Sequence, residues 1–147
     1  FLSFVLESKE GNPVSLAIIY SLVAQRLNIP IYGVNLPQHF ILGFVQDIDW
    51  IPLLRFNDES SLSDKAGSEI MFYINPFNNG LIFNRENIDK FLKHLKLEPK
   101  DDYFKVCSNK DILMRVLRNL ETSFAKENKH NKLKLVKKLL NVLIAED

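Results

Sequence analysis

The sequence predicts an α+β fold, with a buried helix near the N-terminus, an antiparallel sheet and a helical hairpin at the C-terminus. Three observations lead to this prediction. The run VSLAIIYSLVAQRL at 14–27 is apolar almost all round, which is typical of a helix buried on several sides. Short runs rich in Ile, Val, Phe and Tyr follow it, as expected of strands. Two segments near the C-terminus carry apolar residues at three-and-four spacing, the pattern of amphipathic helices.

Size and composition indicate one compact domain with a small appendage. The chain has 147 residues, of which 46% are hydrophobic and 25% charged, an ordinary profile for a globular protein with a core. We expect a core at 1–95, a connecting segment at 96–108, and a hairpin at 109–147 that packs on the core. The formal net charge of +1 requires neither nucleic acid nor an anionic membrane as partner, and the oligomeric state stays open.

The first two helices are bounded by clear signals. Residues 1–7 are typical of the tail of a helix. Asn12 then offers a side-chain cap, and Pro13 suits the first helical position, where its missing N–H costs nothing. Asn28 and Pro30 end the apolar helix, since proline does not continue it.

Strand patterns fill the middle of the chain. The first two predicted strands are separated by the short turn Pro37-Gln38-His39, and the last two by the breaker-rich turn 75–80. A polar, serine-rich loop is expected at 57–69. The predicted strands are Ile31–Leu36, Phe40–Val45, Ile70–Ile74 and Leu81–Phe83, with Trp50–Phe56 as a further candidate.

Helices are predicted for the rest of the chain. Asn84 caps a helix that reaches about Leu95, and Ser108 or Asn109 caps the next. A polar break at 126–131 precedes the last amphipathic helix. Two such helices with a short link predict an antiparallel hairpin.

Three separated motifs together resemble a known family. They are GNPVSLAIIY at 11–20, GVNLPQHF at 33–40 and INPFNNG at 74–80. Their order and surroundings look like the transglutaminase-like superfamily, in the bacterial branch named after the SirB-one protein. The resemblance covers residues 1–95 and implies a papain-like α+β core. The hairpin that follows is similar to the tetratricopeptide-like tail that this branch often carries.

The resemblance also implies where a catalytic triad would lie. In that superfamily a buried helix begins with a catalytic cysteine, one strand supplies a histidine and another an aspartate. Counted back from the exit Leu-Asn-Ile-Pro of the helix, the cysteine position falls on Pro13. His39 matches the histidine, and Asn75 matches the aspartate. Proline has no nucleophilic atom, so the resemblance implies a pseudo-enzyme, whereas Asn75 is still able to fix the tautomer of an imidazole.

Other nucleophiles fit this site poorly. Ser15 lies two positions beyond Pro13, which rotates its side chain by about 200° around the helix, and first-turn hydrogen bonding explains it more simply. Cys107 is the only thiol, so no intrachain disulfide forms, and this favours a reducing, cytoplasmic compartment. The three histidines, His39, His94 and His130, are isolated in the sequence, so we expect no metal site and no cofactor.

Two functions from different classes follow from these residues. The first is a non-catalytic binding or scaffold domain with a protein partner, in which the hairpin and a remnant cleft recognise that partner. The second is a hydrolase or amidase-like enzyme that uses His39 as a general base with a non-standard nucleophile. His39 is accordingly either a structural histidine or a ligand contact. The residues expected to line the cleft are Asn12, Ser15, Asn35, Gln38, His39, Asn75 and Asn78.

Overall fold

The computed structural model describes residues 2–45 and 70–145. The chain divides into two compact units, Phe1–Cys107 and Ser108–Asp147. In the described residues, five α-helices and a four-stranded antiparallel sheet make an α+β structure, as the sequence predicts. The possible strand Trp50–Phe56 and the polar loop at 57–69 lie outside the described residues.

The first unit begins with two helices, α1 (Leu2–Ser8) and α2 (Pro13–Arg26). The predicted cap of α2 is confirmed, because Asn12 Oδ1 accepts a hydrogen bond of 2.9 Å from the backbone N–H of Ser15. One face of α2 is buried. The prediction of burial on several sides is wrong for its other face, where Leu22 and Val23 are 48% and 53% exposed. The apolar pattern alone does not show which side of a helix lacks a neighbour.

The sheet has the strand order β1-β2-β3-β4, with every neighbouring pair antiparallel. The pair β1–β2 closes tightly, since Leu36 lies opposite His39. A register shift between Phe44 and Val45 interrupts the pairing of β2 with β3. The strands are β1 (Ile31–Leu36), β2 (His39–Val45), β3 (Ile70–Asn75) and β4 (Leu81–Phe83).

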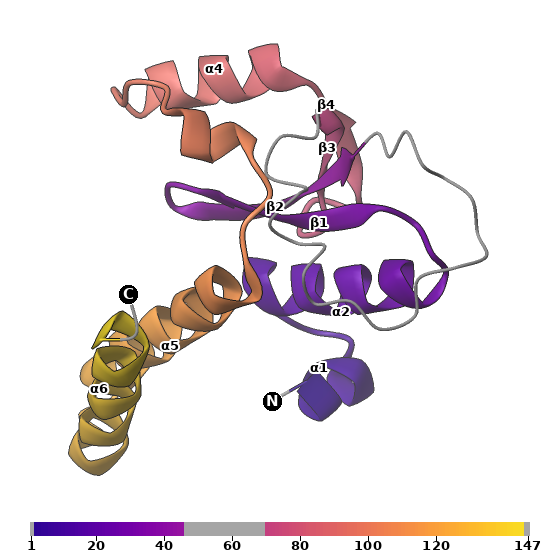
Figure 1. Cartoon of the computed structure of the whole chain (residues 1–147). Helices are drawn as coiled ribbons and strands as arrows, with labels where there is room; N and C mark the ends of the chain where they lie inside the picture. The colour runs from indigo at the N-terminus through magenta and orange to yellow at the C-terminus, as the bar shows by residue number, and fades with distance from the viewer. Residues whose placement is uncertain (1, 46–69, 146–147) are drawn as a thin grey trace. The chain divides into compact units, whose positions relative to one another are not determined.

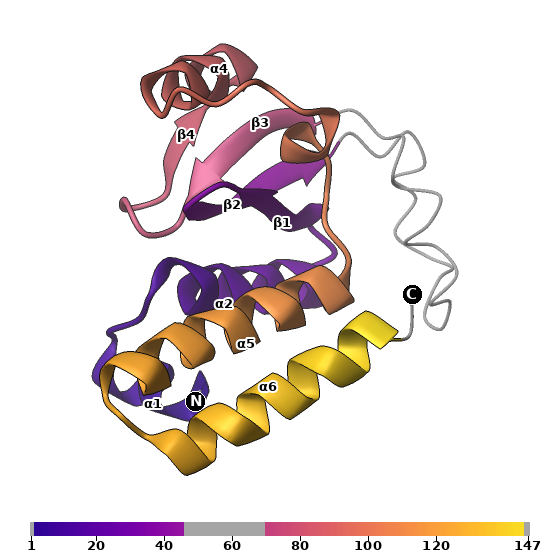
Figure 2. The same ribbon diagram turned by 90° about the vertical axis from the view of Figure 1, so that its left-hand side faces the viewer.

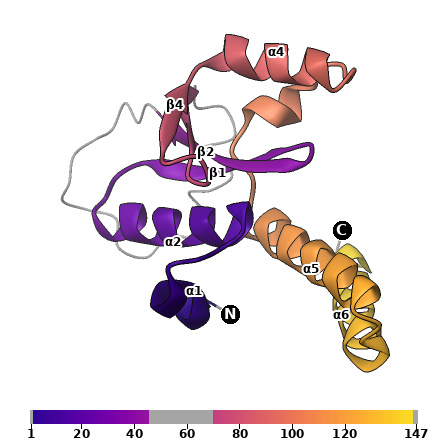
Figure 3. The same cartoon turned by 180° about the vertical axis from the view of Figure 1, so that it is seen from behind.

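Helices cover both faces of the sheet, so that the first unit has three layers. Figures 1 and 3 show α2 on one face and α4 (Arg85–His94) on the other. The helix α4 begins at Asn84 with a capping box that Asn87 completes, which confirms the predicted cap. On the α4 side, the strands and α4 share a core formed by Val34, Leu36, Ile41, Tyr73, Ile88, Leu92 and Phe104.

The expected connecting segment 96–108 belongs to the first unit as far as Cys107. It forms a short 3₁₀ helix, η2 (Asp101–Phe104), which inserts Phe104 into the core beneath α4. The guanidinium of Arg85 lies 3.9 Å from the centre of the Phe104 ring, within the range of a cation–π contact. Burial raises the pKa of the neighbouring Tyr73 hydroxyl, and the nearby Arg85 charge opposes that rise.

The second unit is the predicted helical hairpin. It consists of α5 (Asn109–Lys126) and α6 (His130–Ala145), which run antiparallel and side by side (Figure 2). Ser108 caps α5, with its hydroxyl accepting from the N–H of Asp111. The hairpin has its own small core, in which Leu117 of α5 meets Val136 and Leu140 of α6.

Candidate functional site

Pro13 occupies the first turn of α2, directly after the Asn12 cap. The predicted position at the start of the buried helix is therefore confirmed. This is where a helix leaves its first N–H groups without intrahelical partners, and where its dipole would stabilise a thiolate. The pyrrolidine ring has no atom that attacks a carbonyl carbon. The amino end of α2 thus offers the electrostatics of a nucleophile site without the nucleophile.

Ser15 is buried behind this first turn. Only 1% of its surface is exposed, and its hydroxyl donates a hydrogen bond of 3.0 Å to the carbonyl oxygen of Asn12. A methyl group at Gly11 would lie 2.6 Å from Ser15 Oγ, so the missing side chain of Gly11 makes room for that hydroxyl. The Ser15 hydroxyl is therefore buried within the first turn of α2, where its hydrogen bond to Asn12 has a structural role.

His39 is displayed by the tight turn between β1 and β2. Gln38, the second residue of that turn, has a φ of 60°, in the left-handed region that side-chain-bearing residues seldom adopt. The imidazole that follows is exposed, and it stacks on Phe91 of α4 with 4.8 Å between ring centres and 16° between planes. Its Nδ1 lies 3.0 Å from the carbonyl oxygen of Gln38. When Nδ1 donates to that oxygen, Nε2 carries the lone pair.

Asn75 ends β3 and shapes the turn that follows. Its Oδ1 accepts hydrogen bonds from the N–H groups of Phe77 and Asn78, at 3.0 and 3.2 Å. Asparagine and aspartate make this kind of turn equally well. The positive φ values of Asn79 and Gly80, 51° and 72°, show that the rest of the turn requires residues that tolerate the left-handed region.

The structure puts His39 and Asn75 on the same face of the sheet but gives each a different partner. Strand alternation aligns His39 with Ile41, and Asn75 with Tyr73; both of these residues belong to the core on the α4 side. Within the described residues, no hydrogen bond joins the imidazole to Asn75. Pro13, in contrast, begins the helix that covers the opposite face (Figure 1).

The remaining predicted cleft residues are distributed over both faces. Asn12 is an exposed helix cap, and Gln38 and Asn78 are exposed turn residues. Asn35 is half-buried and is aligned with Phe40, which lies on the face opposite to His39. The seven residues therefore do not all project from one side of the sheet.

Cys107 closes the first unit and lies against β1. Its backbone N–H donates a hydrogen bond of 2.8 Å to the carbonyl oxygen of Gly33. An added Cβ at Gly33 would lie 3.1 Å from Cys107 Sγ and 2.8 Å from Phe40 Cζ, so the sulfur and that ring both pack against Gly33. The thiol is half-buried and serves in packing.

Phe91 is the contact of the site that sequence reasoning missed. Its three-and-four spacing with Ile88 and Leu95 predicts only that it faces inward. Its stacking partner comes from a strand more than fifty residues earlier, and no local pattern in the sequence encodes that pairing. The stacked pair of His39 and Phe91 is therefore evident only from the tertiary structure.

Two other kinds of site, a metal centre and a membrane-spanning helix, are not found in the described residues. Among residues 2–45 and 70–145, no group of three or more His, Cys, Asp or Glu side chains is arranged to hold a metal ion. In the same parts of the chain, no helix combines the length and the apolar character needed to cross a bilayer.

Comparison with known proteins assigns the family. The model of the transglutaminase-like superfamily matches residues 1–118, which is most of the chain. This chain therefore belongs to the transglutaminase-like superfamily, as the three sequence motifs predict. No solved structure matches it.

Its relatives include bacterial proteins named UPF0162. The chain is 30% identical over 135 residues to one from Xylella fastidiosa (strain 9a5c), covering 88% of this chain and 41% of that protein. It is 32% identical over 119 residues to one from Pseudomonas aeruginosa, covering 81% and 36%. A mammalian relative is F-box only protein 21 of Mus musculus, at 28% over 103 residues, 65% of this chain and 16% of that protein. The chain spans about two fifths of the length of the bacterial relatives.

Proposed function

We propose that this chain is a non-catalytic transglutaminase-like domain that binds another protein. The observation that supports this proposal is the occupation of the first turn of α2 by Pro13, the position that the family resemblance assigns to the catalytic cysteine. Acyl transfer through a thioester requires a thiolate at this position, and a proline side chain supplies none in any conformation. The family fold is retained, whereas the group that forms the covalent intermediate is missing.

The contacts of Ser15, Cys107 and His39 support a binding role. The Ser15 hydroxyl is buried and bonded to Asn12, and the Cys107 thiol packs against Gly33. Neither of them is a partner of the His39 ring, whose contacts are Phe91 and the Gln38 carbonyl. An exposed imidazole stacked on a phenyl ring is a suitable ligand contact, and we assign this role to the pair His39 and Phe91.

The hairpin α5–α6 supplies the second proposed recognition surface. It is an antiparallel helical hairpin with its own core, the form expected of the tetratricopeptide-like tail of the SirB-one branch. We further propose that the protein works in the cytoplasm, which its single thiol favours.

A second candidate function has one observation in its favour. When Nδ1 of His39 donates to the Gln38 carbonyl, Nε2 carries the lone pair of an exposed ring. Such a nitrogen is able to take a proton from water, so a hydrolase that uses His39 as general base is the alternative. Asn75 does not orient this base as the family's aspartate would, because Asn75 Oδ1 accepts hydrogen bonds from N–H groups of its own turn.

An assay of acyl transfer separates the two functions. The wild-type chain and a His39→Ala variant are incubated with glutaminyl peptides, and both ammonia release and incorporation of a labelled amine are followed. We expect no turnover above the buffer rate for either protein. A rate well above buffer that His39→Ala abolishes would overturn the binding proposal and establish the hydrolase or transferase.

A further inference from the structure

The last helix carries two adjacent apolar stripes, of which the hairpin uses one. Val136 and Leu140 form the stripe that packs on α5. Leu135, Leu139 and Val142 form a second stripe at i, i+4 and i+7, and they are 59%, 46% and 58% exposed. Side chains at this spacing lie on one face of a helix, so the exposed stripe is continuous. A helix with two such stripes is typical of one packed between two neighbours.

The charges of α6 are of one sign. The helix contains the lysines at 132, 134, 137 and 138, and no Asp or Glu occurs between His130 and Ala145. Lys137 and Lys132 turn toward α5, where Lys137 Nζ lies 3.9 Å from Glu121 Oε1 and Lys132 Nζ lies 5.7 Å from the centre of the Phe124 ring.

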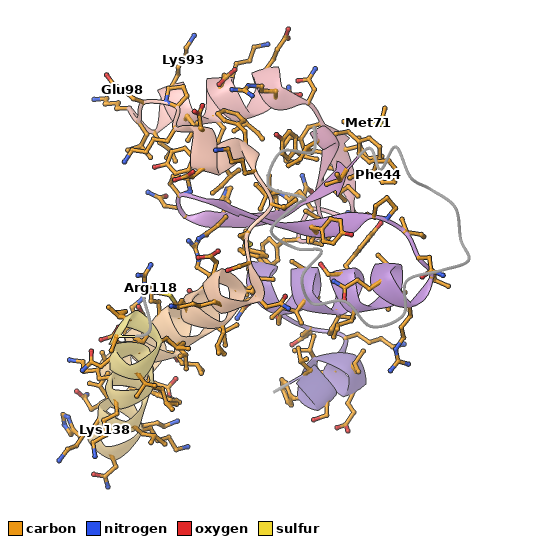
Figure 4. The ribbon with its side chains drawn as sticks, viewed as in Figure 1. Phe44, Met71, Lys93, Glu98, Arg118 and Lys138 are labelled. Atoms are coloured by element: carbon orange, nitrogen blue, oxygen red, sulfur yellow. The ribbon has the colours of Figure 1, made fainter. Side chains whose placement is uncertain are left out.

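The other two lysines, Lys134 and Lys138, are one helical turn apart. They border the exposed stripe on its side away from the buried one. Lys138, which is labelled in Figure 4, is exposed on the surface of the hairpin. The stripe therefore has a positively charged edge formed by two exposed lysines.

We propose that the surface formed by Leu135, Leu139, Val142, Lys134 and Lys138 docks an acidic amphipathic helix of a partner protein. This inference rests on the proposed binding function and specifies the partner. The partner helix would place apolar residues at i, i+4 and i+7 against the stripe and carboxylates against the two lysines. Charge complementarity selects this occupant over a second copy of the chain, because two α6 helices would bring their lysines together.

The proposal is tested with the full chain and two labelled helical peptides. Both peptides carry leucine at i, i+4 and i+7; one has glutamates beside the leucines and the other has lysines. Fluorescence anisotropy is expected to show binding of the acidic peptide at least tenfold tighter than that of the basic peptide at low salt. The double variant Lys134→Glu/Lys138→Glu is expected to reverse this preference.

A matched pair of variants locates the binding surface. Leu139→Ser is expected to weaken acidic-peptide binding at least tenfold, whereas Leu22→Ser, at a similarly exposed leucine of α2, leaves it unchanged. Both variants retain the thermal unfolding midpoint of the wild type, because they remove no buried side chain.

Three results would overturn the proposal. The first is equal binding of the two peptides, or none. The second is binding of a single-stranded oligonucleotide that depends on the lysines and is insensitive to Leu139→Ser. The third is a dimer in sedimentation that Leu139→Ser dissociates, since the occupant would then be a second copy. None of these results changes the turnover measured in the acyl-transfer assay. Failure of this inference is therefore distinguishable from failure of the proposed function.

Discussion

Replacing Phe40 with alanine is expected to lower the free energy of unfolding by about 3–5 kcal/mol. Phe40 is 2% exposed, and its ring fits against Gly33, whose missing side chain provides the space. A Cβ at Gly33 would lie 2.8 Å from Phe40 Cζ, so the ring occupies the space beside this glycine. When the ring is removed, Gly33 has no side chain that can move into the cavity. Urea denaturation followed by far-UV circular dichroism measures the loss.

The matched control is Phe77→Ala, which removes the same ring from a turn residue that is 58% exposed. This variant is expected to stay within about 0.5 kcal/mol of the wild type. A loss of less than about 1 kcal/mol for Phe40→Ala, or equal losses for the two variants, would contradict the packing described for β1 and β2.

Pro13→Cys is expected to create a thiol with a pKa below the usual value for cysteine. The partial positive charge at the amino end of α2 stabilises a thiolate at this position, although the Asn12 side chain already accepts the N–H of Ser15. We expect iodoacetamide at pH 7 to alkylate this thiol on the order of fivefold faster than a thiol introduced by Gln25→Cys in the last turn of the same helix. Peptide mapping by mass spectrometry separates both from Cys107.

Adding His39→Ala to Pro13→Cys tests where the imidazole lies. The ring of His39 stacks on Phe91, on the face of the sheet opposite to α2, so its removal is expected to leave the alkylation rate unchanged. A several-fold slower rate in the double variant would place the imidazole beside residue 13 and contradict this arrangement. Equal rates at positions 13 and 25 would refute the helix-dipole explanation.

Most of the fold was predictable because its signals are local. The strand bounds Ile31–Leu36 and Leu81–Phe83 agree with the structure, since β-branched and aromatic runs lie between strong breakers. The caps Asn12 and Asn84 were predictable from side chains that bond within their own first turn. The hairpin helices follow from amphipathic spacing, while their packing on the core stays a prediction.

The parts that were missed depend on partners distant in the sequence. The exposure of Leu22 and Val23 depends on what lies beside α2, which the apolar pattern does not contain. The insertion of Phe104 beneath α4 comes from a 3₁₀ turn in a stretch without periodicity.

The three positions implied by the family were located in sequence, but their side-chain partners were not. His39 meets Phe91, and Asn75 meets its own turn. These choices depend on strand alternation and tertiary contacts. The chain belongs to the transglutaminase-like superfamily, whereas its place in the SirB-one branch stays a prediction.

The central proposal is that neither Ser15 nor Cys107 forms a covalent acyl intermediate, and intact-mass spectrometry tests it most directly. The wild-type chain is incubated with a glutaminyl peptide, quenched in acid at short times and weighed. We predict a single species with the unmodified mass. An adduct equal to the peptide mass less ammonia, mapped to Ser15 or Cys107 and lost in His39→Ala, would contradict the account.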